Sequence, residues 1–363
     1  MDLKKATELL YRKIQKKMEQ DILSAEKNVA KKDTPEQKIA FSLSEELPDL
    51  LLKQGFLFCQ EQKKGLGEDF CLAEYREDQL LIGVFDGCGG SGARIYPKLE
   101  GHTGAYVASR AATRAVKRWF RKQKEDQENS LKTCIDAELD ICRSFAGAAS
   151  VLKGSLNREF PTTMAMFCLK KQQAEFFWCG DSRGYFLDRE GLHQVTVDDV
   201  TVTDAMQNLR EDAPMTNVIS ASRPYKIHRR KLELKNPGIL LVATDGCFGY
   251  LTSPMEFERL LLETLQDAGD LKEWKEKLRE KIGKVAGDDY TLGLWICGSD
   301  SFRHLKGYMK PRLDHMSVVL GADGQTEEKL YEQWECYRRI YESLWQKGQE
   351  LPDEEAGCGE KEK

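Results

Sequence analysis

Hydrophobic positions along the chain follow two different periods. Short apolar, β-rich runs that end in Gly, Asp or Asn are typical of strands. They predict strands over Gln79–Phe85, Thr163–Leu169, Glu175–Gly180, Gly184–Asp188, Ile239–Thr244 and Tyr290–Cys297. Apolar residues three and four positions apart predict helices instead. Such stretches cover Gly104–Arg121, Cys134–Leu152, Leu271–Val285 and Thr326–Gln349, and Ser253-Pro254-Met255-Glu256 predicts the start of another helix with a capping box.

The order of these elements indicates the fold class. The predicted helices fall in two long pairs and do not follow each strand in turn. This arrangement favours an α+β domain of antiparallel sheets with helices on their outer faces over a doubly wound parallel fold.

Both ends of the chain differ from the middle. The apolar face Leu3, Ala6, Leu10, Ile14, Met18 and Ile22 predicts an amphipathic N-terminal helix, and a charged linker follows it. The domain boundaries predicted from these patterns are 1–48 for helix and linker, 49–300 for the main domain, and 301–363 for a C-terminal extension. Little regular pattern is visible from 298 to 325. An aromatic helix that we expect to pack on the rest of the protein follows, and then a charged tail.

Composition excludes several classes of protein. The 363 residues carry a formal net charge of -5, which gives no electrostatic reason to expect a nucleic acid or an anionic membrane as partner. No apolar run approaches the roughly 20 residues of a membrane span, and the N-terminus lacks a signal-peptide pattern. The 11 cysteines show no CxxC spacing, which favours free thiols in a reducing compartment. We therefore expect a cytoplasmic protein.

Acidic residues recur at the ends of predicted strands. Asp86, Asp181, Asp245 and the pair Asp288-Asp289 follow or precede apolar runs, and Glu68-Asp69 precedes another. Each alone is an ordinary turn signal. Together, carboxylates that converge at one sheet edge would suit Mg²⁺ or Mn²⁺, which prefer oxygen ligands. Two such ions could activate a shared water and bind a phosphoryl group.

Two glycine motifs suggest other functions. The segment from Gly87 to Gly92 fits GxGxxG, but Pro97 and Gly101 delay the helix that a dinucleotide site needs directly after the loop. The segment from Gly180 to Gly184 fits GxSxG, but a strand-like stretch follows it where a nucleophile elbow requires a helix. Both alternatives are therefore disfavoured.

The order of the motifs resembles a known family. The series GLGEDF, IGVFDGCGGSG, PTTMAM, WCGDSRGYFLDREGLHQVT, LLVATDGCFGYLT and GDDYTLGLW is similar to that of PPM-type (type 2C) metal-dependent serine/threonine protein phosphatases. The resemblance runs from about Phe56 to Cys297. It implies a four-layer sandwich of two antiparallel sheets flanked by helical pairs, with a dinuclear Mn²⁺ or Mg²⁺ centre at one end.

The resemblance also implies the roles of particular residues. Asp86 would bridge both metals, with the Gly87 carbonyl and Glu68 on one side and Asp245 and Asp288 on the other. Asp181 matches an aspartate of a weaker third metal site. A water bridging two metal ions would hydrolyse phosphoserine and phosphothreonine in phosphoprotein substrates, presumed to oppose a Ser/Thr kinase in signalling.

Three positions depart from the family's usual pattern. Lys64 stands where an arginine usually binds phosphate, and lysine offers a point charge in place of a bidentate fork. Cys88 replaces a histidine proposed as general acid, and Gly249 replaces a supporting carboxylate. The segment from Ser91 to Thr103 also resembles an insertion.

Two hypotheses follow from the complete ligand set and from these departures. The first is an active phosphatase, slower than typical or specialised, with Asp86 and Lys64 as catalytic residues. The second is a pseudophosphatase that binds phosphoproteins as a regulatory module. The retained acidic cluster favours the enzyme, because a binding domain has little need of desolvated carboxylates.

Overall fold

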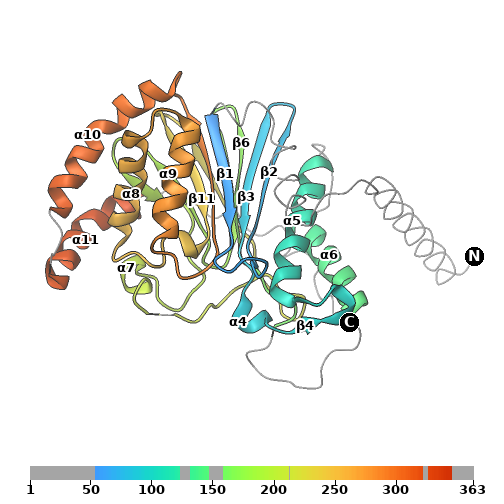
Figure 1. Cartoon of the computed structure of the whole chain (residues 1–363). Coiled ribbons are helices and arrows are strands. Elements are labelled where there is room, and N and C mark those ends of the chain that lie inside the picture. Colours follow the sequence, from blue (N-terminus) through green and yellow to red (C-terminus); the bar gives the residue numbers. More distant parts are fainter. Residues whose placement is uncertain (1–53, 123–130, 147–157, 212, 322–325, 346–363) are drawn as a thin grey trace, which may run out of the picture. The chain divides into compact units, whose positions relative to one another are not determined.

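The computed structural model of the chain contains two five-stranded antiparallel sheets, with helices on the outer face of each (Figure 1). It describes residues 54–122, 131–146, 158–211, 213–321 and 326–345, all of which belong to one compact unit. The layering of helices, sheet, sheet and helices confirms the α+β fold class predicted from the order of the elements. The predicted N-terminal helix and the charged tail lie outside the described residues.

The first sheet contains the strands nearest the C-terminal helices. Its order is β1 (Gly55–Gln60), β12 (Tyr290–Cys297), β11 (Gly238–Ala243), β8 (Arg183–Leu187) and β9 (Leu192–Gln194). Every residue of β11 and β12 is buried, as their continuous apolar sequences require for central strands of a covered sheet. β8 confirms the strand-like stretch predicted at the GxSxG motif, and a turn joins it to the antiparallel β9.

The second sheet also has five strands. Its order is β10 (His228–Glu233), β7 (Gln173–Cys179), β6 (Met164–Lys170), β3 (Gln79–Phe85) and β2 (Phe70–Arg76). The predicted strands agree with β3, β6, β7, β8, β11 and β12 to within about two residues at each end. Strands β1, β2, β9 and β10 were not predicted.

Glycines let the two sheets approach closely. A Cβ atom at Gly184 of β8 would lie 2.6 Å from the Phe176 ring of β7, in the opposite sheet. A Cβ atom at Gly293 of β12 would lie 2.4 Å from Ile82 of β3. Neither distance is compatible with a side chain, so these glycines allow close packing of the two sheets.

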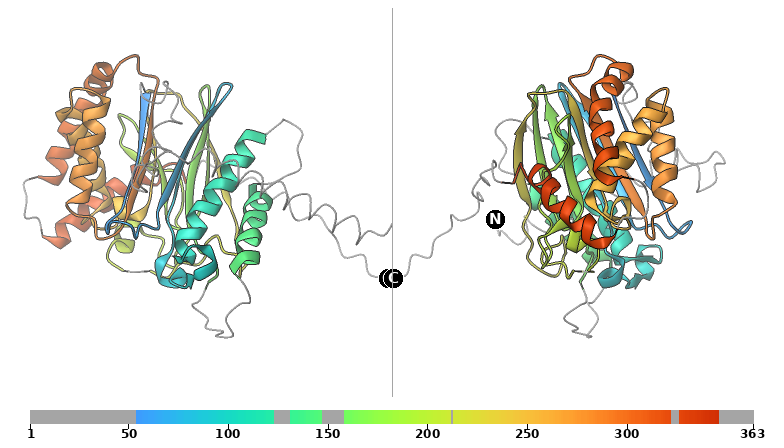
Figure 2. Two further views of the ribbon diagram at one scale, coloured as in Figure 1. Left: turned by 45° about the vertical axis from the view of Figure 1, so that its right-hand side comes forward. Right: turned by 90° about the vertical axis from the view of Figure 1, so that its left-hand side faces the viewer.

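Each outer face carries its own group of helices, as the two rotated views in Figure 2 also show. α5 (Gly104–Lys122) and α6 (Leu131–Ala146) share a hydrophobic core with β2, β3, β6 and β7. α8 (Pro254–Asp267), α9 (Leu271–Gly283), α10 (Phe302–Leu320) and α11 (Glu327–Tyr341) share another with the first sheet. Short elements lie in the connections: α4 (Gly89–Gly92), β4 (Ile95–Tyr96), η1 (Pro97–Leu99), β5 (His102–Thr103), α7 (Ala205–Asn208) and η2 (Asp245–Cys247).

The start of α8 confirms a prediction in atomic detail. The Ser253 hydroxyl accepts a hydrogen bond from the backbone N–H of Glu256, and the Glu256 carboxylate accepts one from the N–H of Thr252. Pro254 occupies the first helical position, where no N–H is needed. The sequence signal for this helix start is strong because all three features are local.

The expectation that 298–325 lacks regular structure is wrong, because α10 fills most of it. Gly307 and Pro311 weaken the sequence signal, since both are poor residues for a helix interior. Packing overrides the propensity: the inward face of α10 is buried along its length, at Leu305, Met309, Met316 and Leu320.

The aromatic stripe of the C-terminal extension packs on the first sheet and its helices, as expected. Trp334, Tyr337 and Tyr341 of α11 are buried in the core that α8 and α10 share. The helix is shorter than the predicted Thr326–Gln349, and it ends at Tyr341. None of the helices in the described part of the chain has the length and apolar character that a bilayer span requires.

Candidate metal centre

The strand register places the predicted acidic residues at one end of the sandwich. In the second sheet, Phe85 at the end of β3 pairs with Phe70 at the start of β2, and Cys179 ends β7 beside Met164. In the first sheet, Ala243 at the end of β11 pairs with Leu292, near the start of β12. The same end of the sandwich therefore holds the residues that follow β3, β7 and β11 and those that precede β2 and β12.

An open cleft of about 560 Å³ lies at this end. The carboxylates that line it are Glu68, Asp69, Asp86, Asp181, Asp245, Asp288 and Asp289. The other lining residues are Gln62, Lys63, Leu66, Gly87–Ser91, Met215 and Gly287. The structure thus brings together all the residues that the sequence suggests as metal ligands.

Asp86 and Asp245 form the centre of the acidic cluster. Both carboxyl groups line the cleft. Burial, and then the charges of Asp69, Asp245 and Asp181, raise the pKa of Asp86 well above its usual value. Burial and the charge of Asp288 raise the pKa of Asp245 to about 6. Clustered buried carboxylates do not all ionise readily without a cation.

Asp181 reaches the same cluster from the connection between β7 and β8. This connection crosses between the two sheets and turns at Gly180, whose φ of +98° favours glycine. The Asp181 Oδ1 atom is buried and has no hydrogen-bond partner. Burial, Asp245 and Asp198 raise the pKa of Asp181 to about 8. An unpartnered buried oxygen is costly, so it indicates a missing ligand.

In each of the two acidic pairs at the cleft, Glu68-Asp69 and Asp288-Asp289, the second residue accepts hydrogen bonds from neighbouring segments. The Asp69 carboxylate accepts hydrogen bonds from the hydroxyls of Thr244 and Thr291, 2.9 and 2.7 Å away. Asp289 accepts hydrogen bonds from the backbone N–H groups of Gln62 and Glu68, at 2.8 and 2.6 Å. Asp69 and Asp289 therefore tie neighbouring loops together.

Their partners Glu68 and Asp288 remain the candidate ligands. The Glu68 carboxylate accepts a hydrogen bond from the Thr103 hydroxyl at the start of α5. Burial, more than any other effect, raises the pKa of Glu68. Arg110 of α5 donates hydrogen bonds to the backbone carbonyls of Gly67 and Glu68, both 3.3 Å away, and so fixes the loop before β2. No sequence pattern indicated a role for Thr103 or Arg110.

Gly87 and Cys88 form the floor of the cleft after β3. A Cβ atom at Gly87 would lie 2.7 Å from the carbonyl oxygen of Ala105, so the backbone approaches closely only because this residue is glycine. Burial, and then the charges of Asp86, Asp181 and Asp245, raise the pKa of the Cys88 thiol well above its ordinary value. Cys88 is thus a neutral thiol at physiological pH.

The predicted phosphate-binding lysine lies at the edge of this arrangement. Lys64 is exposed and is not among the residues that line the cleft, whereas its neighbour Lys63 is. Gly249 donates a backbone hydrogen bond to the Asp245 carbonyl, and a Cβ atom there would lie 2.9 Å from that oxygen. The role predicted for Lys64 stays a prediction.

The donor set fits hard divalent cations. Among the described residues, no three His, Cys, Asp or Glu side chains already surround one point as a closed metal shell. Mg²⁺ and Mn²⁺ do not require one, because Mg²⁺ usually keeps several waters and takes one or two carboxylates. The Asp86 and Asp245 carboxyls, whose pKa values are raised, and the unpartnered Asp181 oxygen are donors that such ions would satisfy.

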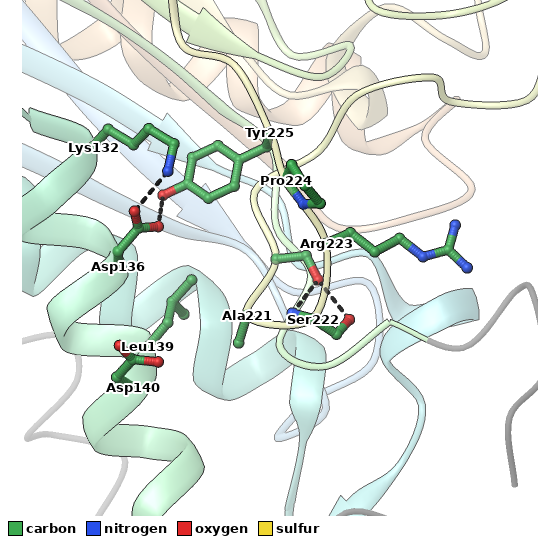
Figure 3. A pocket seen from close by; sticks show the side chains of 10 residues that line it. Lys132, Asp136, Leu139, Asp140, Ala221, Ser222, Arg223, Pro224 and Tyr225 are labelled. Carbon is green, nitrogen blue, oxygen red and sulfur yellow. Dashed lines mark hydrogen bonds and ion pairs between the residues drawn. The ribbon is translucent and has the colours of Figure 1, made fainter. Parts of the chain in front are cut away.

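A second cleft, of about 370 Å³, lies between α6 and residues 220–225 (Figure 3). Its polar groups are satisfied within the chain. Asp136 accepts hydrogen bonds from the Lys132 ammonium, 2.6 Å away, and from the Tyr225 hydroxyl, 2.7 Å away. None of the predicted site residues lies here.

Comparisons with known proteins identify the family of the chain. The family model described as Protein phosphatase 2C matches residues 60–282, which is more than half of the chain. The chain belongs to the protein phosphatase 2C family. The resemblance predicted from the motifs is thereby confirmed, and the chain is a protein serine/threonine phosphatase.

Individual relatives of this phosphatase are distant. A protein of Mycoplasma genitalium described as a putative protein phosphatase is 25% identical over 248 residues, 62% of this chain and 88% of that protein. The serine/threonine phosphatase Stp1 of Staphylococcus aureus has a similar structure, with a TM-score of 0.53 and 20% identity over 68% of this chain and 96% of Stp1. A C. elegans sex-determining protein also has a similar structure, with a TM-score of 0.51 and 15% sequence identity over 71% of this chain and 67% of that protein. These structures support the shared fold.

Proposed function

We propose that this phosphatase hydrolyses phosphoserine and phosphothreonine in protein substrates and requires two Mn²⁺ or Mg²⁺ ions. The observation that carries the proposal is the convergence of Asp86, Asp245 and Asp181 on one cleft, where the Asp181 Oδ1 atom is buried without a hydrogen-bond partner. Such a cluster is unfavourable without cations and well suited to them.

Each acidic residue has a task in this proposal. Asp86 would hold both ions, Glu68 and the Gly87 carbonyl one of them, and Asp245 and Asp288 the other. Asp181 would hold a weaker third. When bound, the ions supply Lewis-acid activation of a water and neutralise the charge of the phosphoryl group.

The chain's own groups would orient the substrate and the ligands. Thr103 and Arg110 fix the loop that carries Glu68, and Asp289 fixes the same loop from the other side. Lys63 and Lys64 would attract the phosphate as point charges. The neutral thiol of Cys88 is a poor acid toward a leaving alkoxide, so we expect slower turnover than a histidine at this position would allow.

The experiment is hydrolysis of a phosphothreonine peptide by the full chain with Mn²⁺, with EDTA, and by an Asp245→Asn variant. Turnover that needs Mn²⁺ and falls at least 100-fold in the variant supports the proposal. Asp300→Asn, at an exposed position, is a matched control that should keep full turnover. If calorimetry shows Mn²⁺ binding but the peptide is not hydrolysed, the proposed enzyme activity would be contradicted and the pseudophosphatase hypothesis favoured. No observation supports that hypothesis at present.

The partners and the location follow from the same proposal. A phosphoprotein substrate implies a Ser/Thr kinase that supplies it, because the phosphoester must be formed before it is hydrolysed. The cytoplasmic location predicted from the absence of a signal pattern stays a prediction.

A further inference from the structure

Cys59 and Cys71 lie on edge strands that face each other across the sandwich. Cys59 is the penultimate residue of β1, the edge of the first sheet, and Cys71 is the second residue of β2, the edge of the second. The strands are joined by residues 61–69, which carry Glu68 at the cleft. The two cysteines therefore stand at the two ends of an active-site loop.

The alternation of β1 indicates where Cys59 points. Phe56 and Phe58 pack under the outer helices, where their rings contact Trp274 and Tyr290. Residues between them in a strand point the other way. Leu57 does so, because a Cβ atom at Gly293 would touch both Leu57 and a residue of the second sheet. Cys59 shares the face of Leu57 and so points toward the second sheet.

The same argument holds for β2. Leu72 belongs to the core under α5, and Glu74 forms ion pairs with Lys117 and Arg121 of that helix. Cys71 lies on the opposite face and points toward the first sheet. Cysteines from the two edge strands therefore meet between the sheets.

The two thiols differ in character, since Cys71 is buried and Cys59 is half-buried. The neighbouring Cys71 thiol is the largest influence that lowers the pKa of Cys59, and Thr291 and Arg110 lower it further against the effect of burial. The neighbouring Cys59 sulfur, together with burial, raises the pKa of Cys71. Cys59 is thus the nucleophile of the pair, and Cys71 can resolve its oxidised form.

We propose that Cys59 and Cys71 are a redox couple, which a peroxide converts to a disulfide that closes the Glu68 loop. The Cys59 thiolate attacks one peroxide oxygen, the O–O bond breaks, and hydroxide leaves a sulfenic acid on Cys59. The Cys71 sulfur then attacks the Cys59 sulfur, the S–O bond breaks, and the hydroxyl leaves as water with the Cys71 proton. Two thiols and one H₂O₂ give one disulfide and two waters.

Closure of the loop should disturb the cleft. A disulfide bond is about 2.0 Å long, which is shorter than any contact between two free thiols, so the ends of β1 and β2 must move together. Asp69, two residues before Cys71, is held by Thr244 and Thr291, and Glu68 precedes it. A displacement of about 1 Å at a reacting centre can cost roughly 100-fold in rate. We expect turnover to fall at least 10-fold on oxidation. This effect rests on the proposed function, whereas formation of the disulfide does not depend on it.

The test treats the full-length protein with a small molar excess of H₂O₂, blocks free thiols with N-ethylmaleimide, and identifies linked peptides by mass spectrometry. A peptide pair joined through Cys59 and Cys71 is expected in the parent, and it should be absent from Cys59→Ser and Cys71→Ser. Cys134→Ser, on α6, is the matched control and should keep the linkage. Absence of the linked pair from the folded parent, or its replacement by a linkage to another cysteine, would overturn the couple.

Turnover of the phosphothreonine peptide with Mn²⁺ is the second measurement. We expect a loss of at least 10-fold after oxidation that dithiothreitol reverses, and resistance of the two serine variants to peroxide. If the disulfide forms and turnover is unchanged, the effect on the cleft is refuted. If the reduced parent has no turnover, the proposed function fails, and the mass spectrum alone decides the couple. Cys59→Ala replaces Cys59→Ser should the serine variant fail to fold, as judged by circular dichroism.

Discussion

Arg312 of α10 and Glu258 of α8 form a two-point ion pair inside the molecule. The guanidinium Nε and Nη2 atoms lie 2.5 and 3.0 Å from the two carboxylate oxygens, and neither side chain exposes more than 5% of its surface. Glu258 also accepts hydrogen bonds from the Tyr337 hydroxyl of α11 and from the backbone N–H of Leu192. A single carboxylate thus joins α8, α10, α11 and β9.

Arg312→Leu should destabilise the protein strongly, because it leaves the Glu258 charge buried without its partner. The expected loss is about 3–5 kcal/mol in the free energy of unfolding. Urea denaturation followed by tryptophan fluorescence measures it. Arg303→Leu, at an exposed position of the same helix, should change the value by less than about 0.5 kcal/mol.

The double variant Glu258→Leu with Arg312→Leu separates charge from packing. Removal of both charges should recover most of the lost stability, since an apolar pair can replace a buried ion pair at little cost. A double variant as unstable as Arg312→Leu alone would show that the ion pair matters chiefly through its shape.

Trp334→Ala tests whether α11 is part of the folded core. Trp334 is completely buried, and its indole N–H donates a hydrogen bond to Asp204, 3.0 Å away, before α7. The substitution should cost about 3–5 kcal/mol in the free energy of unfolding. Cys336→Ala, exposed on the other side of the helix, should cost almost nothing. Equal stability of both variants would mean that α11 is dispensable.

The sequence predicted the fold where the signal is local and missed it where packing decides. Continuous apolar runs identify β3, β11 and β12, because both faces of these strands are covered. β10 carries charged residues at Arg229, Arg230, Lys231 and Glu233 and forms an edge strand, so its apolar signal is weak. α10 contains Gly307 and Pro311 and forms because its inward face is buried.

Gly307→Ala should stabilise the protein. Gly307 is exposed inside α10, and a Cβ atom there would meet nothing within 4 Å. Alanine lowers the backbone entropy of the unfolded chain and favours the helix, which adds roughly 0.5–1 kcal/mol. Thermal unfolding should show a small rise in Tm. A fall in Tm would indicate that the glycine serves a conformational need.

Asp188→Asn should destabilise the protein at neutral pH and leave its stability unchanged in acid. Although burial acts to raise it, the hydrogen bonds from His193 and from the backbone of Glu190 and Gly191 hold the pKa of Asp188 below its ordinary value. A lowered folded-state pKa stabilises the protein above the unfolded pKa of about 3.9, and this stabilisation is lost as pH falls through the folded value. The variant should therefore be less stable than the parent by about 1 kcal/mol at pH 7, with the gap closing below about pH 4. Urea titrations at several pH values measure the gap, and a gap that widens in acid would contradict the assignment.

The gathering of the acidic residues in one cleft was predictable from the sequence, and the contacts that support them were not. Asp86, Asp181 and Asp245 each follow a strand, and the antiparallel register carries all three to one edge. The sequence could not show which residue of Glu68-Asp69 and of Asp288-Asp289 is held by hydrogen bonds, because the hydrogen-bond partners lie some 170 to 230 residues away. Thr103 belongs to the segment that resembles an insertion, so no pattern marked it.

Cys88→His should raise turnover most where the leaving group needs a proton. The Cys88 thiol lies beside Asp86, Asp181 and Asp245, which raise its pKa and keep it neutral. A protonated histidine at this position could donate its proton to a departing threonine alkoxide. We expect kcat for a phosphothreonine peptide to rise at least 10-fold.

The control is p-nitrophenyl phosphate, whose leaving group departs without protonation, so its kcat should change little in Cys88→His. Cys88→Ala should show no gain with either substrate, since it supplies no acid. Equal gains for both substrates would mean that the histidine acts on phosphate binding or on the metal ions and not as an acid. No gain for the peptide would indicate that the site is adapted around the cysteine, and that a proton reaches the leaving group from another source.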